Sequence, residues 1–262
     1  MTATVTSADG TPIAFDTYGS GTPVLLVGGA VNDRTTVAGL AAVLADAGFA
    51  AIAYDRRGRG DSGDAPVYAV EREIDDLEVL IEAVGGSAAV FGHSSGAILS
   101  LEAAARGLPI TKVAVYEPPY IGDDRPRPAE DLVDRVSARL ADGDRDGAVE
   151  LFLVEGTGTP AEIVESMKAA PVWGWFVGLA HTLPYDLTVC GRGNRLPADR
   201  LAAITVPVLS LSGGAGEAWM TSSSKAVAAA VAHGRYEEIP GQDHGVLNAP
   251  ESLRDVLTNF LR

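Results

Sequence analysis

The stretch Gly92-His93-Ser94-Ser95-Gly96 constrains the fold of this chain more than any other. A short apolar run, residues 88–91, leads into it, and an alanine- and leucine-rich pattern of helical type follows through residue 105. Where a strand turns sharply into a helix, the central residue is held in strained dihedral angles. The positions two residues to either side then have no room for a side chain, a condition that glycine meets. The pattern predicts Ser94 exposed at the carboxyl end of a strand. An ordinary glycine- and serine-containing turn is the alternative for these residues taken alone.

Strand-like runs alternate with helical patterns through most of the chain. The main runs are residues 24–27, 50–54, 88–91, 112–116, 206–211 and 235–239. Continuous apolar strands are typical of a parallel sheet that helices cover on both faces. The order therefore predicts an α/β fold with a doubly wound, mostly parallel sheet flanked by helices. Ligands bind at the carboxyl ends of the strands in such sheets, where Ser94, Gly29 and Glu117 are predicted to lie.

The pattern changes between residues 121 and 199, where helical segments follow one another without strands. We predict a helical cap here, inserted into a single α/β core that residues 1–120 and 200–262 form. The densest aromatic patch of the chain lies in this segment, and we predict that it encloses a substrate. Packing within the cap's own core is the alternative for about half of these side chains. The predicted substrate-binding residues of the cap are Trp173, Trp175, Phe176, His181 and Tyr185.

A histidine lies between the last predicted strand and the last predicted helix, in Pro240-Gly241-Gln242-Asp243-His244-Gly245. A histidine on a glycine-flanked loop after a strand is not expected to be a residue of the hydrophobic core. Imidazole gains and loses a proton near neutral pH, so His244 is predicted to transfer protons.

Together these stretches resemble the α/β-hydrolase fold family. The resemblance also rests on Asp55-Arg56-Arg57-Gly58-Arg59-Gly60-Asp61-Ser62-Gly63 and Pro207-Val208-Leu209, and it covers roughly residues 24–262. It implies that Ser94 is the nucleophile and His244 the general base, in the family's chain order. It also implies an oxyanion hole made by the backbone N–H groups of Ala30 and Ser95. Ser94 occupies the nucleophile's place, which disfavours epoxide hydrolases and haloalkane dehalogenases, whose nucleophile is an aspartate.

The acid of a catalytic triad is where this sequence departs from the family's usual pattern. In relatives it usually follows the strand that matches residues 206–211, and that place is Gly216, which has no carboxylate. Glu217 is adjacent and is our second choice. Some relatives place the acid after the preceding strand of the core, where this chain has Glu117, which we favour. A solvated surface acid is the alternative for Glu217, and a salt bridge to an arginine is the alternative for Glu117.

Composition narrows the partners of this chain. Its 262 residues carry a net charge of −15, which disfavours nucleic acid and anionic membrane surfaces. The four histidines have no metal-ligand spacing and Cys190 is the one cysteine, so no metal site is expected. Gly28-Gly29 lacks the later residues of a dinucleotide fingerprint, and no cofactor is expected. We found no secretory signal in residues 1–9 and no apolar run of about 20 residues, which predicts a soluble cytoplasmic protein. The oligomeric state is left open.

These features predict a cofactor-independent serine hydrolase of the esterase, thioesterase or lactonase kind. It would cleave an ester-like or thioester-like bond in a small, largely apolar organic molecule through an acyl-enzyme. One alternative is a non-hydrolytic enzyme on the same fold, such as a cyclase, a lyase or a cofactor-free peroxidase, that uses Ser94 and His244 as acid and base. The other is a ligand-binding protein with weak turnover or none.

Overall fold

A computed structural model describes residues 2–123 and 125–262. Met1, in the segment searched for a signal, and Asp124, in the predicted cap, lie outside the described residues. The described chain forms one eight-stranded sheet in the order β1-β2-β4-β3-β5-β6-β7-β8. The strands are β1 (Ala3–Thr6), β2 (Pro12–Gly19), β3 (Thr22–Val27), β4 (Phe49–Tyr54), β5 (Ala88–His93), β6 (Ile110–Tyr116), β7 (Val208–Gly213) and β8 (Gly234–Ile239). The pairs β1·β2 and β2·β4 are antiparallel and the other neighbours are parallel, so the predicted mostly parallel sheet is confirmed.

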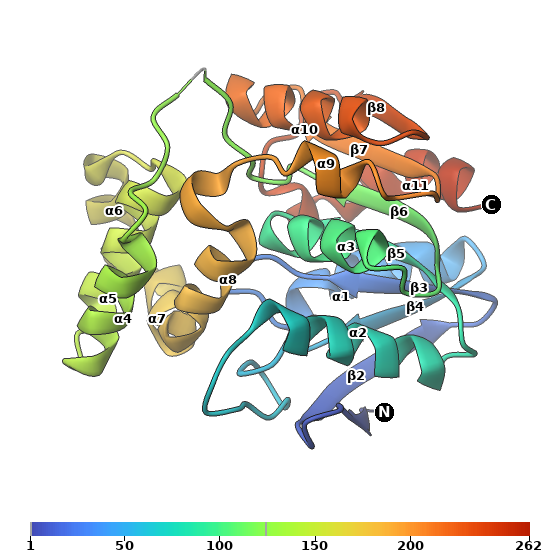
Figure 1. Ribbon diagram of the computed structural model, residues 1–262, viewed down its shortest axis with the longest axis horizontal. Coiled ribbons are helices and arrows are strands. Elements are labelled where there is room, and N and C mark those ends of the chain that lie inside the picture. Colours follow the sequence, from blue (N-terminus) through green and yellow to red (C-terminus); the bar gives the residue numbers. More distant parts are fainter. Residues whose placement is uncertain (1, 124) are drawn as a thin grey trace.

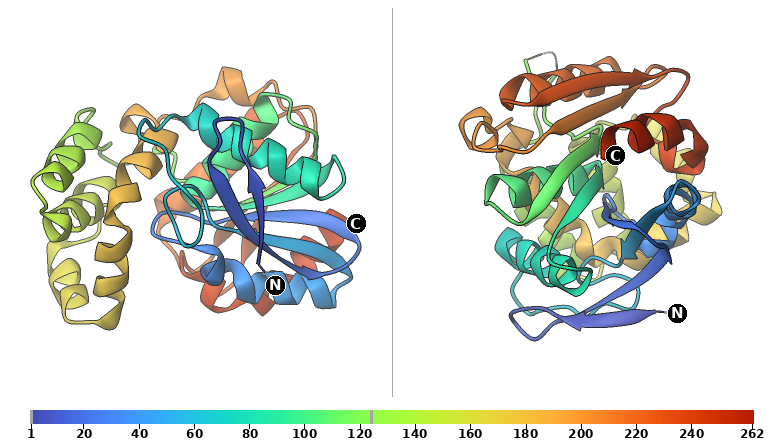
Figure 2. Two further views of the ribbon diagram at one scale, coloured as in Figure 1. Left: turned by 90° about the horizontal axis from the view of Figure 1, so that it is seen from below. Right: turned by 90° about the vertical axis from the view of Figure 1, so that its right-hand side faces the viewer.

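Helices cover both faces of the sheet (Figures 1 and 2). One face packs against α1 (Arg34–Asp46) and α11 (Arg254–Leu261), and the other against α2 (Val70–Ala83), α3 (Ser95–Ala105) and α10 (Ala218–Ala230). Successive strand residues point to opposite faces. In β3, Val24 and Leu26 pack toward α1, whereas Leu25 and Val27 pack toward α3, and all four are fully buried. Burial on both faces explains why this strand has no polar residue in its last four positions.

A helical insertion joins β6 to β7. Its helices are α4 (Leu132–Ala141), α5 (Arg145–Leu151), α6 (Ala161–Lys168), α7 (Pro171–Leu179), α8 (Leu183–Cys190) and α9 (Ala198–Leu201), with a π-helical turn at Phe152–Thr157. Helices α4 to α8 lie together beyond one end of the sheet, as Figure 1 and the left view of Figure 2 show. They enclose a small core of their own that contains Leu132, Val136 and Leu183. This insertion corresponds to the segment predicted to form a cap.

The three arginines of the loop after β4 are buried, and the loop also contains local hydrogen bonds, such as that from the N–H of Asp61 to Asp55. Arg56, Arg57 and Arg59 are each at most 2% exposed. Arg57 pairs with Asp76 of α2 at 2.7 Å, and Arg56 pairs with Glu73 of α2 at 2.6 Å. A guanidinium group carries five N–H donors, and it can be buried only where distant acceptors take them up. The loop therefore fastens the end of β4 to α2, the next helix along the chain.

No helix among the described residues combines the length and the apolar character that crossing a bilayer requires.

Candidate active site

Ser94 occupies the turn between β5 and α3 in a strained backbone conformation. Its φ of 56° and ψ of −124° lie outside the regions that non-glycine residues favour. Its N–H donates to the carbonyl oxygen of Tyr116 in the neighbouring β6 at 2.9 Å, which holds the turn against the sheet. A Cβ atom at Gly92 would lie 2.5 Å from the carbonyl oxygen of Gly96, and one at Gly96 would overlap the carbonyl oxygen of Val27. The two glycines are thus required by this turn, as the sequence predicts.

The turn presents Ser94 to a cavity of about 840 Å³. Ser94 is half-buried, whereas the residues on either side of it in the turn are buried. Helix α3 begins directly after it, so the N-terminal end of that helix points toward the cavity. His244 lines the same cavity, and no hydrogen bond joins these two described residues.

His244 is held by Glu117, the favoured of our two candidate acids. Its Nδ1 lies 2.7 Å from Oε2 of Glu117. Glu117 is fully buried at the end of β6 in a backbone conformation with a φ of 47°, and its Oε1 accepts a hydrogen bond from the N–H of Gly213 at 2.9 Å. The carboxylate thus has a partner for each oxygen, and neither is an arginine. Glu217 is exposed at the start of α10, where it lines the cavity without contacting His244 through a hydrogen bond.

The two residues predicted to supply the oxyanion hole also line the cavity. The backbone N–H groups of Ala30 and Ser95 donate to no acceptor among the described residues. Gly29 lies next to them, because a Cβ atom on it would come within 2.9 Å of Cβ of Ser94. Gly29 itself does not line the cavity, which corrects its predicted contact with substrate. Its carbonyl oxygen accepts from Arg59 at 2.6 Å and its N–H donates to Asn32 at 3.0 Å, so its polar groups are already used.

Comparison with known proteins identifies the family of this chain. The model of a family described as "Alpha/beta hydrolase family" matches residues 24–256. The chain belongs to the alpha/beta hydrolase family. The resemblance seen in its sequence motifs is thereby confirmed.

Similar proteins span almost the whole length of this alpha/beta hydrolase. An alpha/beta hydrolase from Sphaerobacter thermophilus, known from a crystal structure, has 50% sequence identity with this chain. The match covers 99% of this chain and 100% of that chain, with a TM-score of 0.93. A thermophilic esterase from Thermogutta terrifontis is 25% identical over 100% of this chain and 98% of that chain, with a TM-score of 0.76. A putative non-heme bromoperoxidase from Mycobacterium tuberculosis is 25% identical over 260 residues, 95% of this chain and 97% of that protein.

Asp186, on α8 of the insertion, is a residue of this alpha/beta hydrolase site that our sequence analysis missed. It is 1% exposed, and its Oδ1 accepts from the hydroxyl of Ser95 and from Arg56, both at 2.7 Å. Its Oδ2 accepts from Arg59 at 2.7 Å. Burial would raise the pKa of Asp186, but Arg59 and Arg56 outweigh it and hold the pKa below its ordinary value. One ionised carboxylate thus joins the insertion to the residue that follows Ser94.

The signal for such an acid was present in the sequence. Three arginines in five residues, inside a loop between two core elements, need carboxylates from elsewhere if the loop is buried. The pattern does not say which of the 35 acidic residues supplies them.

His93 supports the loop that carries His244. Its Nε2 lies 2.9 Å from the backbone carbonyl oxygen of His244 and donates to it, since a carbonyl oxygen only accepts. Its Nδ1 is buried without a partner among the described residues. Burial, together with the nearby His244, lowers the pKa of His93 to about 3, so the ring is neutral. The structure thus gives His93 a supporting contact with the backbone of His244.

The aromatic residues that we predicted around the substrate do not line the cavity, and this prediction was wrong. Trp173 is buried in the insertion's own core, where its indole N–H donates to Asp146, and Phe176 packs beside it. Trp175 is 43% exposed and donates to the backbone carbonyl oxygen of Val31.

The other two predicted contacts fasten the insertion to the loop after β4. His181 hydrogen bonds through Nε2 with the carbonyl oxygen of Gly58 at 2.8 Å. Tyr185 stacks on Tyr68 with ring centroids 4.2 Å apart, and its hydroxyl donates to Asp64. The apolar part of the cavity is instead supplied by Phe152, Leu153, Leu187, Trp219 and Met220.

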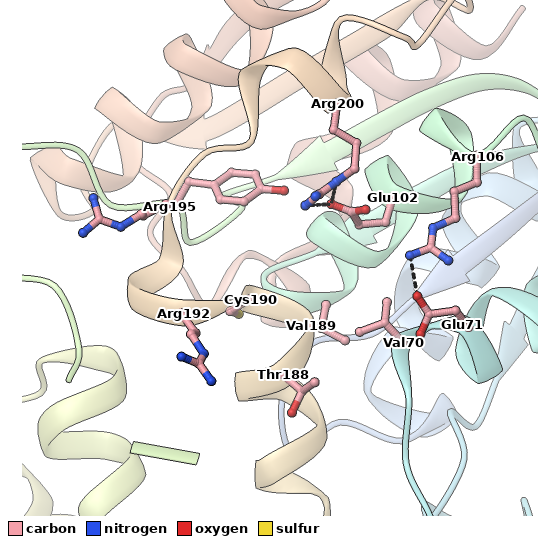
Figure 3. A pocket seen from close by; sticks show the side chains of 12 residues that line it. Val70, Glu71, Glu102, Arg106, Thr188, Val189, Cys190, Arg192, Arg195 and Arg200 are labelled. Carbon is pink, nitrogen blue, oxygen red and sulfur yellow. Dashed lines mark hydrogen bonds and ion pairs between the residues drawn. The ribbon is translucent and has the colours of Figure 1, made fainter. Parts of the chain in front are cut away.

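A second pocket lies on the other side of α8, between this helix and the helices α2 and α3. It measures about 310 Å³ and shares with the larger cavity one described lining residue, Cys190. Arginines and glutamates pair across it, Arg106 with Glu71 and Arg200 with Glu102 (Figure 3). Since neither Ser94 nor His244 reaches this pocket, we take the larger cavity as the candidate active site.

Within residues 2–123 and 125–262, no group of three or more histidine, cysteine, aspartate or glutamate side chains is arranged to hold a metal ion.

Proposed function

We propose that this chain is a serine hydrolase that cleaves an ester-like or thioester-like bond in a small organic molecule through an acyl-enzyme. One observation carries the proposal. A strained serine at a strand-to-helix turn faces a cavity that also contains His244, and the Nδ1 of this histidine is bound by a buried glutamate. A nucleophile, a base and a group that orients the base are the elements that acyl transfer requires.

Each residue then has a defined task. His244 accepts the proton from Oγ of Ser94 through Nε2, since its Nδ1 is directed at Glu117, and Oγ attacks the carbonyl carbon. The backbone N–H groups of Ala30 and Ser95 stabilise the oxyanion. His244 passes the proton to the leaving alcohol or thiol. Water repeats the sequence on the acyl-enzyme, which releases the acid and restores Ser94. The carboxylate of Glu117 stabilises the imidazolium of His244 in both halves of the reaction.

The cavity favours a substrate with a sizeable apolar part. Aromatic and aliphatic side chains from the π-helical turn, α8 and α10 make up much of its wall. A volume of about 840 Å³ is within the range of ligand pockets for small organic molecules.

A fluorophosphonate tests the proposal directly, because it phosphonylates an activated serine. We expect one adduct per chain in the intact mass, absent in Ser94→Ala, and a fall of about 10³-fold or more in the hydrolysis of p-nitrophenyl esters by that variant. A protein that forms no adduct and turns over no ester would refute the proposal.

The relative named a putative non-heme bromoperoxidase supports a second candidate. In that case Ser94 and His244 act as acid and base in a cofactor-free peroxidase and form no acyl-enzyme. An adduct with the fluorophosphonate, combined with no turnover of any ester or thioester, would favour this candidate.

A further inference from the structure

The cavity beside Ser94 has one permanent cation in its wall. Arg125 is the one lysine or arginine among the described residues that line it, and it lies in the segment between β6 and α4. Much of the wall around it is apolar. A charge in such surroundings attracts an opposite charge more strongly than it would in open water, because the local dielectric constant is lower.

The guanidinium of Arg125 is held in position from several sides. It lies over the ring of Trp219, with its central carbon 4.4 Å from the ring centroid. Its Nη1 donates to the carbonyl oxygen of Thr157 at 3.3 Å. Gly158 has a φ of 76°, and a Cβ atom there would overlap Nη2 of Arg125. A glycine at this position therefore leaves the space that the guanidinium fills.

Arg125 has no carboxylate partner among the described residues, although the chain has 35 acidic residues for 20 basic ones. The most buried arginines, Arg56, Arg57 and Arg59, each pair with a carboxylate. Arg125 is half-buried, and beyond its contacts with Trp219 and Thr157 its remaining N–H donors have no acceptor within residues 2–123 and 125–262. The planar guanidinium group matches the geometry of a carboxylate.

We propose that the substrate carries a free carboxylate that binds Arg125 while its ester or thioester carbonyl lies at Ser94. This inference rests on the proposed function, and it narrows the substrate to a carboxylate-bearing ester or thioester. The apolar wall between the two ends contacts the carbon chain that joins them.

Glu217 lines the same cavity and limits where the anionic end can bind. Its exposed carboxylate repels a second one, so the substrate's carboxylate is expected to contact Arg125 and not Glu217. The one other carboxylate in the described lining, Asp186, is already paired with Arg56 and Arg59.

Two matched pairs of esters test the inference. In the first, the acyl part ends in a carboxylate or in its methyl ester: mono-p-nitrophenyl adipate and methyl p-nitrophenyl adipate. In the second pair, the alcohol part carries the carboxylate or its methyl ester: 4-carboxyphenyl hexanoate and 4-(methoxycarbonyl)phenyl hexanoate. We expect kcat/KM for the carboxylate member to exceed that of the methyl ester by about tenfold or more in at least one pair. Arg125→Gln should lower that ratio by about tenfold, and Arg125→Lys should give an intermediate ratio because it keeps the charge and loses the planar fork.

Arg235→Gln is the control for charge, since it removes the same charge from an exposed ion pair on β8 and should leave the ratio unchanged. A ratio near one in both pairs, or a ratio that Arg125→Gln does not lower, would overturn the inference and leave the serine hydrolase intact. The labelling of each variant by fluorophosphonate shows that its active site is folded. Failure of the proposed function differs from this result, because the wild-type protein would then neither form the adduct nor hydrolyse the methyl esters.

Discussion

Replacement of His93 by glutamine should make the protein less sensitive to acid. His93 is 7% exposed and neutral, since burial and the neighbouring His244 lower its pKa from 6.5 to about 3. In the unfolded chain the same ring takes up a proton below pH 6.5. The unfolded state therefore binds more protons than the folded state between pH 6.5 and 3, and folding stability falls as the pH falls through this window.

The size of the effect follows from that difference in pKa. Between neutral pH and pH 5, the linkage relation gives a loss of about 2 kcal/mol in the free energy of unfolding from this ring alone. The carboxylates of the protein add their own pH dependence, which the wild type and His93→Gln share. Glutamine also has an N–H donor for the carbonyl oxygen of His244, but its flexible side chain loses more rotamer freedom on burial than the ring does, which costs about 1 kcal/mol at every pH. At pH 7.5 the wild type should therefore be the more stable protein, and by pH 5 the order should reverse.

Urea denaturation followed by tryptophan fluorescence, at several pH values from 7.5 to 5, measures this difference. The exposed His233 provides the control, and His233→Gln should follow the wild type at every pH. If the difference between wild type and His93→Gln stayed constant over this range, the ring would not be held neutral by burial, and the reasoning would fail.

Three further predictions test other parts of the site. Glu117→Gln should lower kcat for ester hydrolysis by about 10³-fold to 10⁴-fold, since the imidazolium of His244 loses its charge partner. Glu217→Gln should retain at least a tenth of the wild-type kcat. Equal activity in the two variants would contradict the assignment of Glu117 as the triad acid. Asp186→Asn should reduce the free energy of unfolding by about 3–5 kcal/mol, because Arg59 loses the carboxylate that pairs with it. A loss below about 1 kcal/mol, measured by chemical denaturation, would contradict a buried ion pair at this place. Gly96→Ala places a methyl group against the carbonyl oxygens of Val27 and Gly28. It should lower the free energy of unfolding by at least about 1–3 kcal/mol, the usual cost of overpacking a core, and abolish labelling of Ser94 by fluorophosphonate. Full labelling would show that the turn has room for a side chain at this position.

The fold could be predicted from the sequence because its signals are local. A strand buried on both faces must be apolar at every position, and 24–27 and 88–91 show this without any knowledge of their neighbours. The serine turn is local as well, since Gly92 and Gly96 are demanded by atoms within the same turn and the adjacent strand. These features were therefore readable from a single sequence.

The cavity wall could not be predicted, because it depends on how the helices of the insertion rotate against each other. Aromatic residues on α7 turn toward the insertion's own core or toward the loops of the sheet, and Trp219, from α10 of the core, supplies the aromatic wall instead. The aromatic content of a segment shows that it must bury apolar side-chain area, but it does not show which part of the protein this area packs against. The role of Asp186 could not be predicted for the same reason, since its partners lie about 90 to 130 residues away along the chain.

The glycine at the family's usual acid position has a physical explanation in this structure. Strands β6 and β7 are parallel neighbours, so the segments that follow them begin side by side at the same edge of the sheet. Glu117 follows β6, and its carboxylate reaches across to the N–H of Gly213 at the end of β7. A Cβ atom at Gly216 would lie 3.2 Å from Oε1 of Glu117, in contact with the carboxylate that already binds His244. A second carboxylate at residue 216 would bring another negative charge close to the buried carboxylate of Glu117, which raises the cost of ionising that group. One acid is therefore enough at this edge, and a glycine at residue 216 avoids a tight contact with the carboxylate of Glu117.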